Sequence, residues 1–192
     1  MKALLYDALM VPLGWMGLTE ARRRLVAQVH GRVLEVGTGT GLALPGYPEG
    51  VDSITAIDID PESLERARQR RPGVELVLAN VQELPFPGQS FDFVIASLVF
   101  CSVDDPARGL AEIHRVLKPG GELRMLEHVR APSPKLAHLQ DRLTPAWSWM
   151  AGGCRLNRDT FSLVQAAGFN VTRRVQLLDG VGEELTAVRV KE

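Results

Sequence analysis

Three glycines at alternate positions directly follow a short apolar run, and this stretch constrains the fold more than any other. Residues 33–41 read VLEVGTGTG, so the run ends at Gly37, Gly39 and Gly41. The run is typical of a buried parallel strand. Glycines behind such a strand allow a sharp turn and a close approach of backbone to a ligand. We expect residues 42–44 to open a helix pointing at that ligand, which predicts a nucleotide site at the carboxyl end of a first strand.

The spacing of the glycines distinguishes between kinds of nucleotide. The dinucleotide fingerprint G-x-G-x-x-G/A would place its third small residue where this chain has Leu42, and no Gly-Lys-Ser/Thr follows, which excludes a P-loop. The pattern Glu35-x-Gly37-x-Gly39-x-Gly41 instead resembles the first motif of class I S-adenosylmethionine-dependent methyltransferases. The alternative is a glycine-rich turn that holds no ligand. The resemblance implies that Glu35 anchors the loop or the cofactor's ammonium, and that Thr38 and the glycines bind the cofactor.

A carboxylate ends the second predicted strand. Residues 53–58 read SITAID and are followed by Ile59 and Asp60-Pro61, a helix N-cap and first turn. Asp58 stands about 20 residues after the first glycine, where a carboxylate can accept both ribose hydroxyls. The alternative for Asp58 is a second capping group beside Asp60. We expect Asp58 and Ile59 to contact the cofactor.

The third predicted strand, residues 74–78, leads to Asn80 and Val81. The Asn80 amide oxygen can accept from the exocyclic amine of adenine, and the Val81 backbone N–H can meet a ring nitrogen. Most similar methyltransferases carry Asp where Asn80 stands, so this chain keeps the hydrogen bond without the charge. The alternative is an Asn that only stabilises a turn.

Two later strands lead to the same edge of the sheet. Residues 91–97 form an almost wholly apolar strand, typical of a sheet centre, and end at Ser97 and Leu98. A helix over 106–117 is stopped by KPGG, and a strand over 122–127 delivers His128. His128 is a candidate general base, although a strand-end histidine more often binds only backbone.

This succession of LPF, FDFV, RVLKPGG and a strand ending in Glu-His resembles one branch of the class I methyltransferases, those acting on small molecules and lipids. The branch includes ubiquinone and menaquinone C-methyltransferases, phosphatidylethanolamine N-methyltransferases and thiol methyltransferase-like proteins. It implies S-adenosyl-L-methionine as the cofactor, contact of Ser97 and Leu98 with its methionine part, and catalysis by His128. It also implies an α/β, Rossmann-like doubly wound sheet of seven mostly parallel strands in the order 3-2-1-4-5-7-6, with a C-terminal antiparallel hairpin.

Further elements are predicted before and after this core in the sequence. Residues 1–30 are expected to cover the site as a helical lid, with Arg22, Arg23 and Arg24 facing water and Tyr6 able to reach the ligand. The alternative is a leading helix that packs on the sheet. Residues 131–157 carry Trp147, Trp149 and three prolines, and predict an insertion near the active site. The two tryptophans either line an apolar acceptor pocket or cap the core. A helix over 158–167 and two strands, 169–178 and 184–190, complete a single domain of residues 1–192.

The amino-acid composition limits the kinds of binding partner that we expect. The chain has 22 basic and 23 acidic residues, so no nucleic-acid partner is expected, whereas a small-molecule or lipid acceptor and peripheral membrane contact are compatible with it. Two cysteines, Cys101 and Cys154, favour a reduced cytoplasmic setting over a disulfide framework. We expect a monomer or homodimer and no metal. The competing functions are a NAD-dependent oxidoreductase, which Leu42 and the hairpin disfavour, and a non-catalytic S-adenosylmethionine-binding protein.

Overall fold

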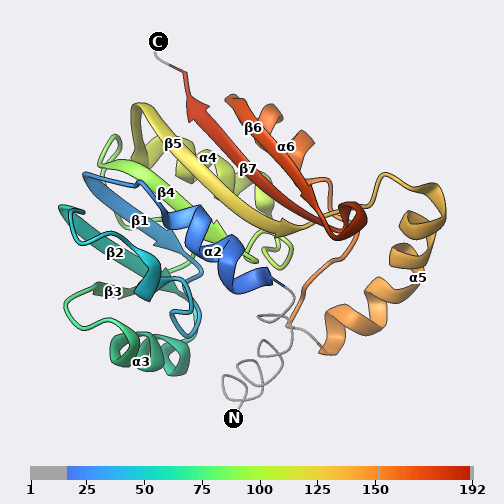
Figure 1. Cartoon of the computed structure of the whole chain (residues 1–192), viewed down its shortest axis with the longest axis horizontal. Coiled ribbons are helices and arrows are strands. Elements are labelled where there is room, and N and C mark those ends of the chain that lie inside the picture. Colours follow the sequence, from blue (N-terminus) through green and yellow to red (C-terminus); the bar gives the residue numbers. More distant parts are fainter. Residues whose placement is uncertain (1–16, 151, 191–192) are drawn as a thin grey trace.

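A seven-stranded sheet in the order β3-β2-β1-β4-β5-β7-β6 forms the centre of the computed structural model, which describes residues 17–150 and 152–190 (Figure 1). The first five strands in this order are parallel, and β7 pairs antiparallel with both β5 and β6. The predicted fold class and strand order are confirmed. The strands are β1 (Arg32–Val36), β2 (Ser53–Asp58), β3 (Glu75–Leu78), β4 (Phe91–Ser97), β5 (Leu117–His128), β6 (Phe169–Leu177) and β7 (Gly182–Arg189).

Helices cover both faces of the sheet, and side chains alternate along the strands to meet them. In β1, Leu34 and Val36 face the core beneath α4 and α6, whereas Val33 packs with α2 and α3 on the opposite face. Both clusters are built from buried aliphatic and aromatic residues, as a sheet covered on two sides requires. The α-helices are α2 (Thr19–Val26), α3 (Pro61–Arg70), α4 (Pro106–Val116), α5 (Pro134–Met150) and α6 (Thr160–Ala166).

The prediction of a helix directly behind the glycine loop is wrong. Residues 37–52 are all described, and they contain only a 3-10 turn, η2 (Leu44–Gly46), with Pro45 at its start. A proline at 45 and another at 48 remove backbone donors and prevent helix continuation. The α2 helix, which precedes β1 in sequence, contacts η2 and covers this face instead. The N-terminus of a long helix therefore does not contribute to the site at β1.

The remaining predicted elements are close to the observed ones, with one extension. The strand expected at 122–127 begins at Leu117, because Phe91 pairs with Leu117 ahead of a register shift in β4. Asp60, Asp105 and Asp159 cap α3, α4 and α6, each accepting a backbone N–H of the first turn. The short turn η3 (Leu178–Gly180) joins β6 and β7, so the predicted closing hairpin is confirmed.

A 17-residue helix, α5, occupies most of the expected insertion and projects beyond the sheet (Figure 1). Gln140 anchors it, since its amide accepts from the Ala131 N–H and donates to the carbonyls of Val129 and Leu156. Pro145 lies inside the helix. The sequence did not indicate a continuous helix here, because the prolines interrupt the pattern. No helix within the described ranges is long and apolar enough to cross a membrane.

Candidate active site

A cleft of about 360 Å³ opens at the carboxyl ends of β1, β2 and β4. Parallel strands direct these ends to one edge of the sheet, which is where ligands bind in open α/β folds. The cleft brings together every predicted cofactor-contacting residue except Gly41, which packs against Ala67 and Leu44. Its lining includes Glu35, Gly37, Thr38, Gly39, Asp58, Ile59, Asn80, Val81, Ser97 and Leu98.

The three glycines of the loop are needed for different structural reasons. All three have positive φ, from 55° to 82°, which disfavours any other residue. A Cβ at Gly37 would lie 2.6 Å from Val99 Cγ2, and one at Gly41 would lie 2.9 Å from the Ala67 Cα of α3. A Cβ at Gly39 would meet nothing within 4 Å, although Gly39 lines the cleft. Gly37 and Gly41 therefore allow packing, and Gly39 leaves open space for a ligand.

Glu35 is a buried carboxylate at the base of the cleft. Its Oε1 accepts from the Thr38 hydroxyl at 2.7 Å, whereas its Oε2 is buried and has no hydrogen-bond partner among the described residues. Burial raises the pKa of Glu35, and the hydrogen bond from Thr38, the nearby Tyr47 hydroxyl and the Arg22 charge only partly oppose this rise. A buried, incompletely satisfied carboxylate oxygen is suited to receive an ammonium group.

Asp58 fixes the glycine loop as well as lining the cleft. Its Oδ2 accepts from the Gly39 N–H at 2.7 Å, and its Oδ1 accepts from the Asp60 N–H at 2.9 Å. Each carboxylate oxygen retains a second lone pair, so ribose contact remains compatible with these bonds. Ile59, next in the chain, is 71 % exposed at the edge of the cleft. An exposed isoleucine there offers an apolar surface for a flat base.

Asn80 adopts the turn interaction that was the alternative to adenine recognition. Its Oδ1 accepts from both the backbone N–H and the side-chain amide of Gln82, at 2.9 and 3.2 Å. Val81 is buried behind it. The amide oxygen would have to release the Gln82 side chain in order to accept from an adenine amine. Contact of Asn80 and Val81 with the cofactor stays a prediction.

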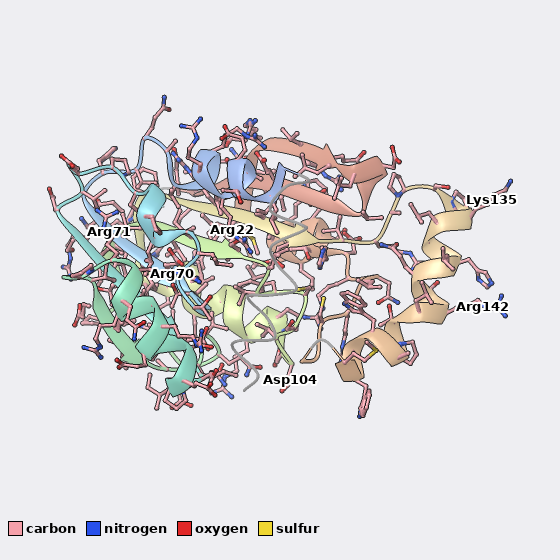
Figure 2. The ribbon with its side chains drawn as sticks, turned by 60° about the horizontal axis from the view of Figure 1, so that its bottom comes forward. Arg22, Arg70, Arg71, Asp104, Lys135 and Arg142 are labelled. Carbon is pink, nitrogen blue, oxygen red and sulfur yellow. The ribbon has the colours of Figure 1, made fainter. Side chains whose placement is uncertain are left out.

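Arg22 is a site residue that sequence reasoning missed. It was expected on the wet face of its helix, but it is only 7 % exposed and lines the cleft (Figure 2). Its Nε donates to the Ser97 hydroxyl at 3.3 Å. Leu25 and Val26 are also buried, and they follow Arg22 by three and four residues, so this helical spacing was the available signal for Arg22. Arg22 places a buried positive charge near Ser97, where the methionine carboxylate is expected.

Leu98 separates the cofactor cleft from a second cavity of about 250 Å³. Its φ is +60°, unusual for a leucine, and its N–H donates to the Leu126 carbonyl at 2.7 Å. Side chains of α2, the end of β5 and the β6–β7 turn line the second cavity, among them Ala21, Leu126 and Leu177. Such strained residues often mark functional sites, and here the strain lies between two cavities.

His128, at the end of β5, lies beside both cysteines. The Cys154 Sγ is 3.5 Å from the His128 Nδ1, and the Cys101 thiol is the second neighbour of Cys154. The hydrogen bond from Cys101 lowers the pKa of Cys154 to about 4, and His128 adds to this effect. The same bond, together with burial, raises the pKa of Cys101. Burial lowers the pKa of His128, but Cys154 and Glu127 outweigh it and hold that pKa above its usual value.

The two tryptophans of the insertion differ. Trp149 is 87 % exposed on α5, so it neither caps the core nor lines a pocket. Trp147 is half-buried, and its indole N–H lies near Cys154 and helps to lower the pKa of that thiol. Only Trp147 is therefore near the candidate catalytic residues. Tyr6 lies outside the described residues.

The residues present fit the cofactor that the resemblance implies. Glu35 offers an unpartnered buried oxygen, Gly39 leaves space that a Cβ would fill, and Asp58 retains acceptor capacity. These features match an ammonium, a close-lying ligand and a ribose, respectively. The Arg22 guanidinium in the same cleft matches a carboxylate.

Comparisons with known proteins agree with this geometry. Residues 34–125 match the family model described as a methyltransferase domain. The chain is 40 % identical over 131 residues to a phosphatidylethanolamine N-methyltransferase of Cereibacter sphaeroides, covering 64 % of each chain. It is 31 % identical over 180 residues to the human thiol S-methyltransferase TMT1B, covering 85 % of this chain and 73 % of that one.

A solved structure supports the fold. The S-adenosylmethionine-dependent methyltransferase of Mesorhizobium loti superimposes with a TM-score of 0.69 at 20 % identity, covering 88 % of this chain and 96 % of that one. The chain spans 64 % of the length of the phosphatidylethanolamine N-methyltransferase it matches, and 59 % of the rat thiol S-methyltransferase TMT1B. The family model, the relatives and the cleft agree, and the chain belongs to the S-adenosylmethionine-dependent methyltransferases.

Proposed function

We propose that this protein transfers a methyl group from S-adenosyl-L-methionine to a small lipophilic acceptor, and that the acceptor atom is a thiol sulfur. One observation carries the proposal: the Glu35–Gly39–Asp58 cleft adjoins a second, largely apolar cavity at Leu98. When bound, the cofactor supplies an electrophilic methyl carbon. The protein's part is to hold the acceptor in line with that carbon and to keep it deprotonated.

The extent of the similarity favours a thiol over the other acceptors of this branch. The match to human TMT1B, a thiol S-methyltransferase by name, covers 85 % of this chain and therefore necessarily spans Cys101, His128 and Cys154. The match to the phosphatidylethanolamine enzyme covers 64 % and need not reach Cys154. His128 lines the second cavity, and we therefore assign it to the acceptor side of the site, where it takes part in activating the acceptor.

Radiolabelled methyl transfer tests the proposal. The purified protein is incubated with labelled cofactor and an alkyl thiol, phosphatidylethanolamine vesicles or a quinol, each in a separate reaction. Label in the thiol alone supports the proposal, whereas label only in lipid or quinol contradicts the acceptor. Binding of the cofactor by calorimetry without transfer to any acceptor would favour a non-catalytic role. NADH fluorescence changes on mixing would favour the oxidoreductase alternative.

Asp58→Ala should weaken cofactor binding by about 1–3 kcal/mol, because the ribose contacts and the bond to the Gly39 N–H are both lost. Titration calorimetry measures the change. Asp105→Ala is the matched control, since the Asp105 carboxylate caps α4 through the Arg108 N–H and does not line the cleft. Equal affinities in the two variants would remove the ribose assignment.

Cofactor affinity should also depend on pH through Glu35. Burial holds the pKa of Glu35 above its usual value, and only the carboxylate attracts an ammonium group. Affinity should therefore fall as the pH is lowered towards that raised pKa. Glu35→Gln cannot ionise, so the ratio of wild-type to variant affinity should shrink from pH 8 to about pH 5. A ratio that stays constant across this range would contradict the ammonium assignment.

We further propose peripheral contact of α5 with an anionic membrane surface. The α5 side chains of Leu139, Leu143, Trp149 and Met150 are 49–87 % exposed. The exposed basic residues Lys135 and Arg142 belong to the same helix (Figure 2). No exposed residue of α5 is acidic; Asp141 is half-buried and paired with Arg130. Exposed apolar side chains among basic ones are typical of helices that lie in a lipid interface.

Leu143→Glu should reduce binding to vesicles of phosphatidylcholine and phosphatidylglycerol about tenfold, because an apolar contact is replaced by a charge repelled by the lipid. Co-sedimentation measures the bound fraction. Leu78→Glu is the control, since Leu78 is 61 % exposed at the end of the edge strand β3, which lies at the opposite end of the molecule from α5 (Figure 1). Wild-type binding that is equal on purely zwitterionic vesicles would contradict the electrostatic part.

The domain organisation, the cellular location and the oligomeric state expected from the sequence are also proposals. The single domain, with residues 1–30 as lid and 131–157 as insertion, is supported by Arg22 and Trp147, which lie near the site. A cytoplasmic location is supported by two free cysteines. Residues 1–16 of the lid lie outside the described ranges. A monomer or homodimer without a nucleic-acid partner is consistent with the balanced charge.

A further inference from the structure

Three metal-binding side chains converge from three separate segments of the chain. Cys101 follows β4, His128 ends β5, and Cys154 lies in the loop after α5. The two sulfurs and one ring nitrogen all lie within 4.8 Å of one another. Both cysteines are buried, and His128 is half-buried. The proposed methyl transfer does not itself require two cysteines at this point.

We propose that Cys101, His128 and Cys154 bind one thiophilic divalent cation of the Zn²⁺ class, leaving a fourth coordination position open. Tetrahedral zinc binds sulfur at about 2.3 Å and histidine nitrogen at about 2.0–2.1 Å, which places the two ligand atoms about 3.5 Å apart. The Cys154 Sγ and His128 Nδ1 are 3.5 Å apart. A disulfide between the cysteines would leave the position of His128 without explanation.

The charges around the cluster favour a cation. Two thiolates and a neutral imidazole balance the double charge of the metal. Glu127, itself only 1 % exposed, precedes His128 in the chain and adds a further carboxyl group to this buried region. A buried negative charge is unfavourable unless it is paired or coordinates a metal.

The ligands are held by a rigid surrounding structure. Glu127 accepts from the backbone N–H groups of Val99, Phe100 and Cys101, at 3.0–3.2 Å, which fixes the loop that carries Cys101. The Arg155 N–H donates to the Cys101 carbonyl at 2.8 Å and ties the second cysteine segment to the first. Supporting bonds of this kind orient the ligands of metal sites.

The cluster borders both cavities, because His128 itself lines the second cavity. Ser102, next to Cys101, and Gly152, two residues before Cys154, both line the cofactor cleft. Three protein ligands with one open position are typical of catalytic zinc sites. The next step rests on the proposed thiol acceptor, whereas the metal site does not. The acceptor's S–H bond breaks, its proton goes to water, and the sulfur lone pair binds the cation, so the thiol is held as a thiolate.

Coordination also redefines the part played by His128. With Nδ1 on the cation, the neutral ring carries its proton on Nε2 and cannot act as a general base. The cation, rather than the imidazole, then deprotonates the thiol.

Cobalt titration of the whole protein tests the metal site without any need for activity. Chelator-treated, phosphine-reduced protein is titrated with Co²⁺, and the near-ultraviolet absorption of cobalt–thiolate bonds is recorded. We expect saturation at one ion per chain and displacement by Zn²⁺. Cys101→Ser and Cys154→Ser should each reduce this absorption by about half, and His128→Ala should weaken Co²⁺ binding at least tenfold. His138→Ala, an exposed histidine on α5, should titrate like wild type.

Absence of the thiolate absorption in folded, reduced wild-type protein would overturn the site, as would equal titration of all four variants. Circular dichroism and cofactor calorimetry establish that each variant is folded. A Cys101–Cys154 disulfide found in place of bound metal in protein that has not been treated with chelator or phosphine would also overturn it. Added alkyl thiol should change the cobalt spectrum without cofactor present; an unchanged spectrum would overturn the open position. Because no arm uses methyl transfer, failure of the metal site is distinguishable from failure of the proposed function.

Discussion

Gly39→Ala should leave the protein folded but lower its affinity for S-adenosylmethionine at least tenfold. The Gly39 φ of +55° adds strain of about 1–2 kcal/mol to any residue with a Cβ. No atom lies within 4 Å of that Cβ, so the fold itself accommodates the methyl group. The added methyl group would occupy cleft space next to the N–H that Asp58 holds. Urea unfolding and titration calorimetry measure the two effects separately.

Gly41→Ala is the matched comparison, with the opposite balance of effects. A Cβ there would lie 2.9 Å from the backbone Cα of Ala67, so α3 would have to move. We expect a loss of about 2–4 kcal/mol in the free energy of unfolding, from overpacking and from strain at φ +82°. If Gly39→Ala proved the more destabilising and Gly41→Ala the more damaging to affinity, the cofactor would not approach the loop at Gly39.

The parts of the fold that sequence alone predicts are those determined locally. Apolar runs followed by glycine, aspartate or histidine mark the strands and the residues at their carboxyl ends. Parallel pairing then carries Glu35, Asp58 and Ser97 to one cleft without further information. Even the missing helix after the glycine loop had a local signal, the prolines at 45 and 48.

The parts that sequence does not predict depend on tertiary contacts. Arg22 stands in a run of three arginines, and helical spacing from Leu25 and Val26 places it on the buried face, but its contact with Ser97 depends on the packing of α2 against the sheet. The meeting of Cys101, His128 and Cys154 requires the α5 insertion to return to the end of β5. The spacing of these residues along the chain contains no indication of that return.

Glu127→Ala should destabilise the protein by about 3–5 kcal/mol, although Glu127 makes no salt bridge among the described residues. Its carboxylate accepts from three consecutive backbone N–H groups, and its removal leaves those donors without partners in a buried loop. Few single side chains in the fold satisfy so much buried backbone. Urea unfolding measures the loss, and a change below about 1 kcal/mol would show that water replaces the carboxylate.

Glu127→Gln separates hydrogen bonding from charge at the same position. Glu127 Oε1 accepts from Val99 and Phe100, and the amide oxygen of glutamine can keep both bonds, whereas its NH₂ group would face the Cys101 N–H. The expected loss is therefore about 1–3 kcal/mol, because one bond becomes a donor–donor contact. Since that contact displaces Cys101, the glutamine variant should also weaken Co²⁺ binding more than it weakens cofactor binding. Equal losses in both titrations would mean that Glu127 supports the whole sheet edge and has no particular role in holding the cysteine loop.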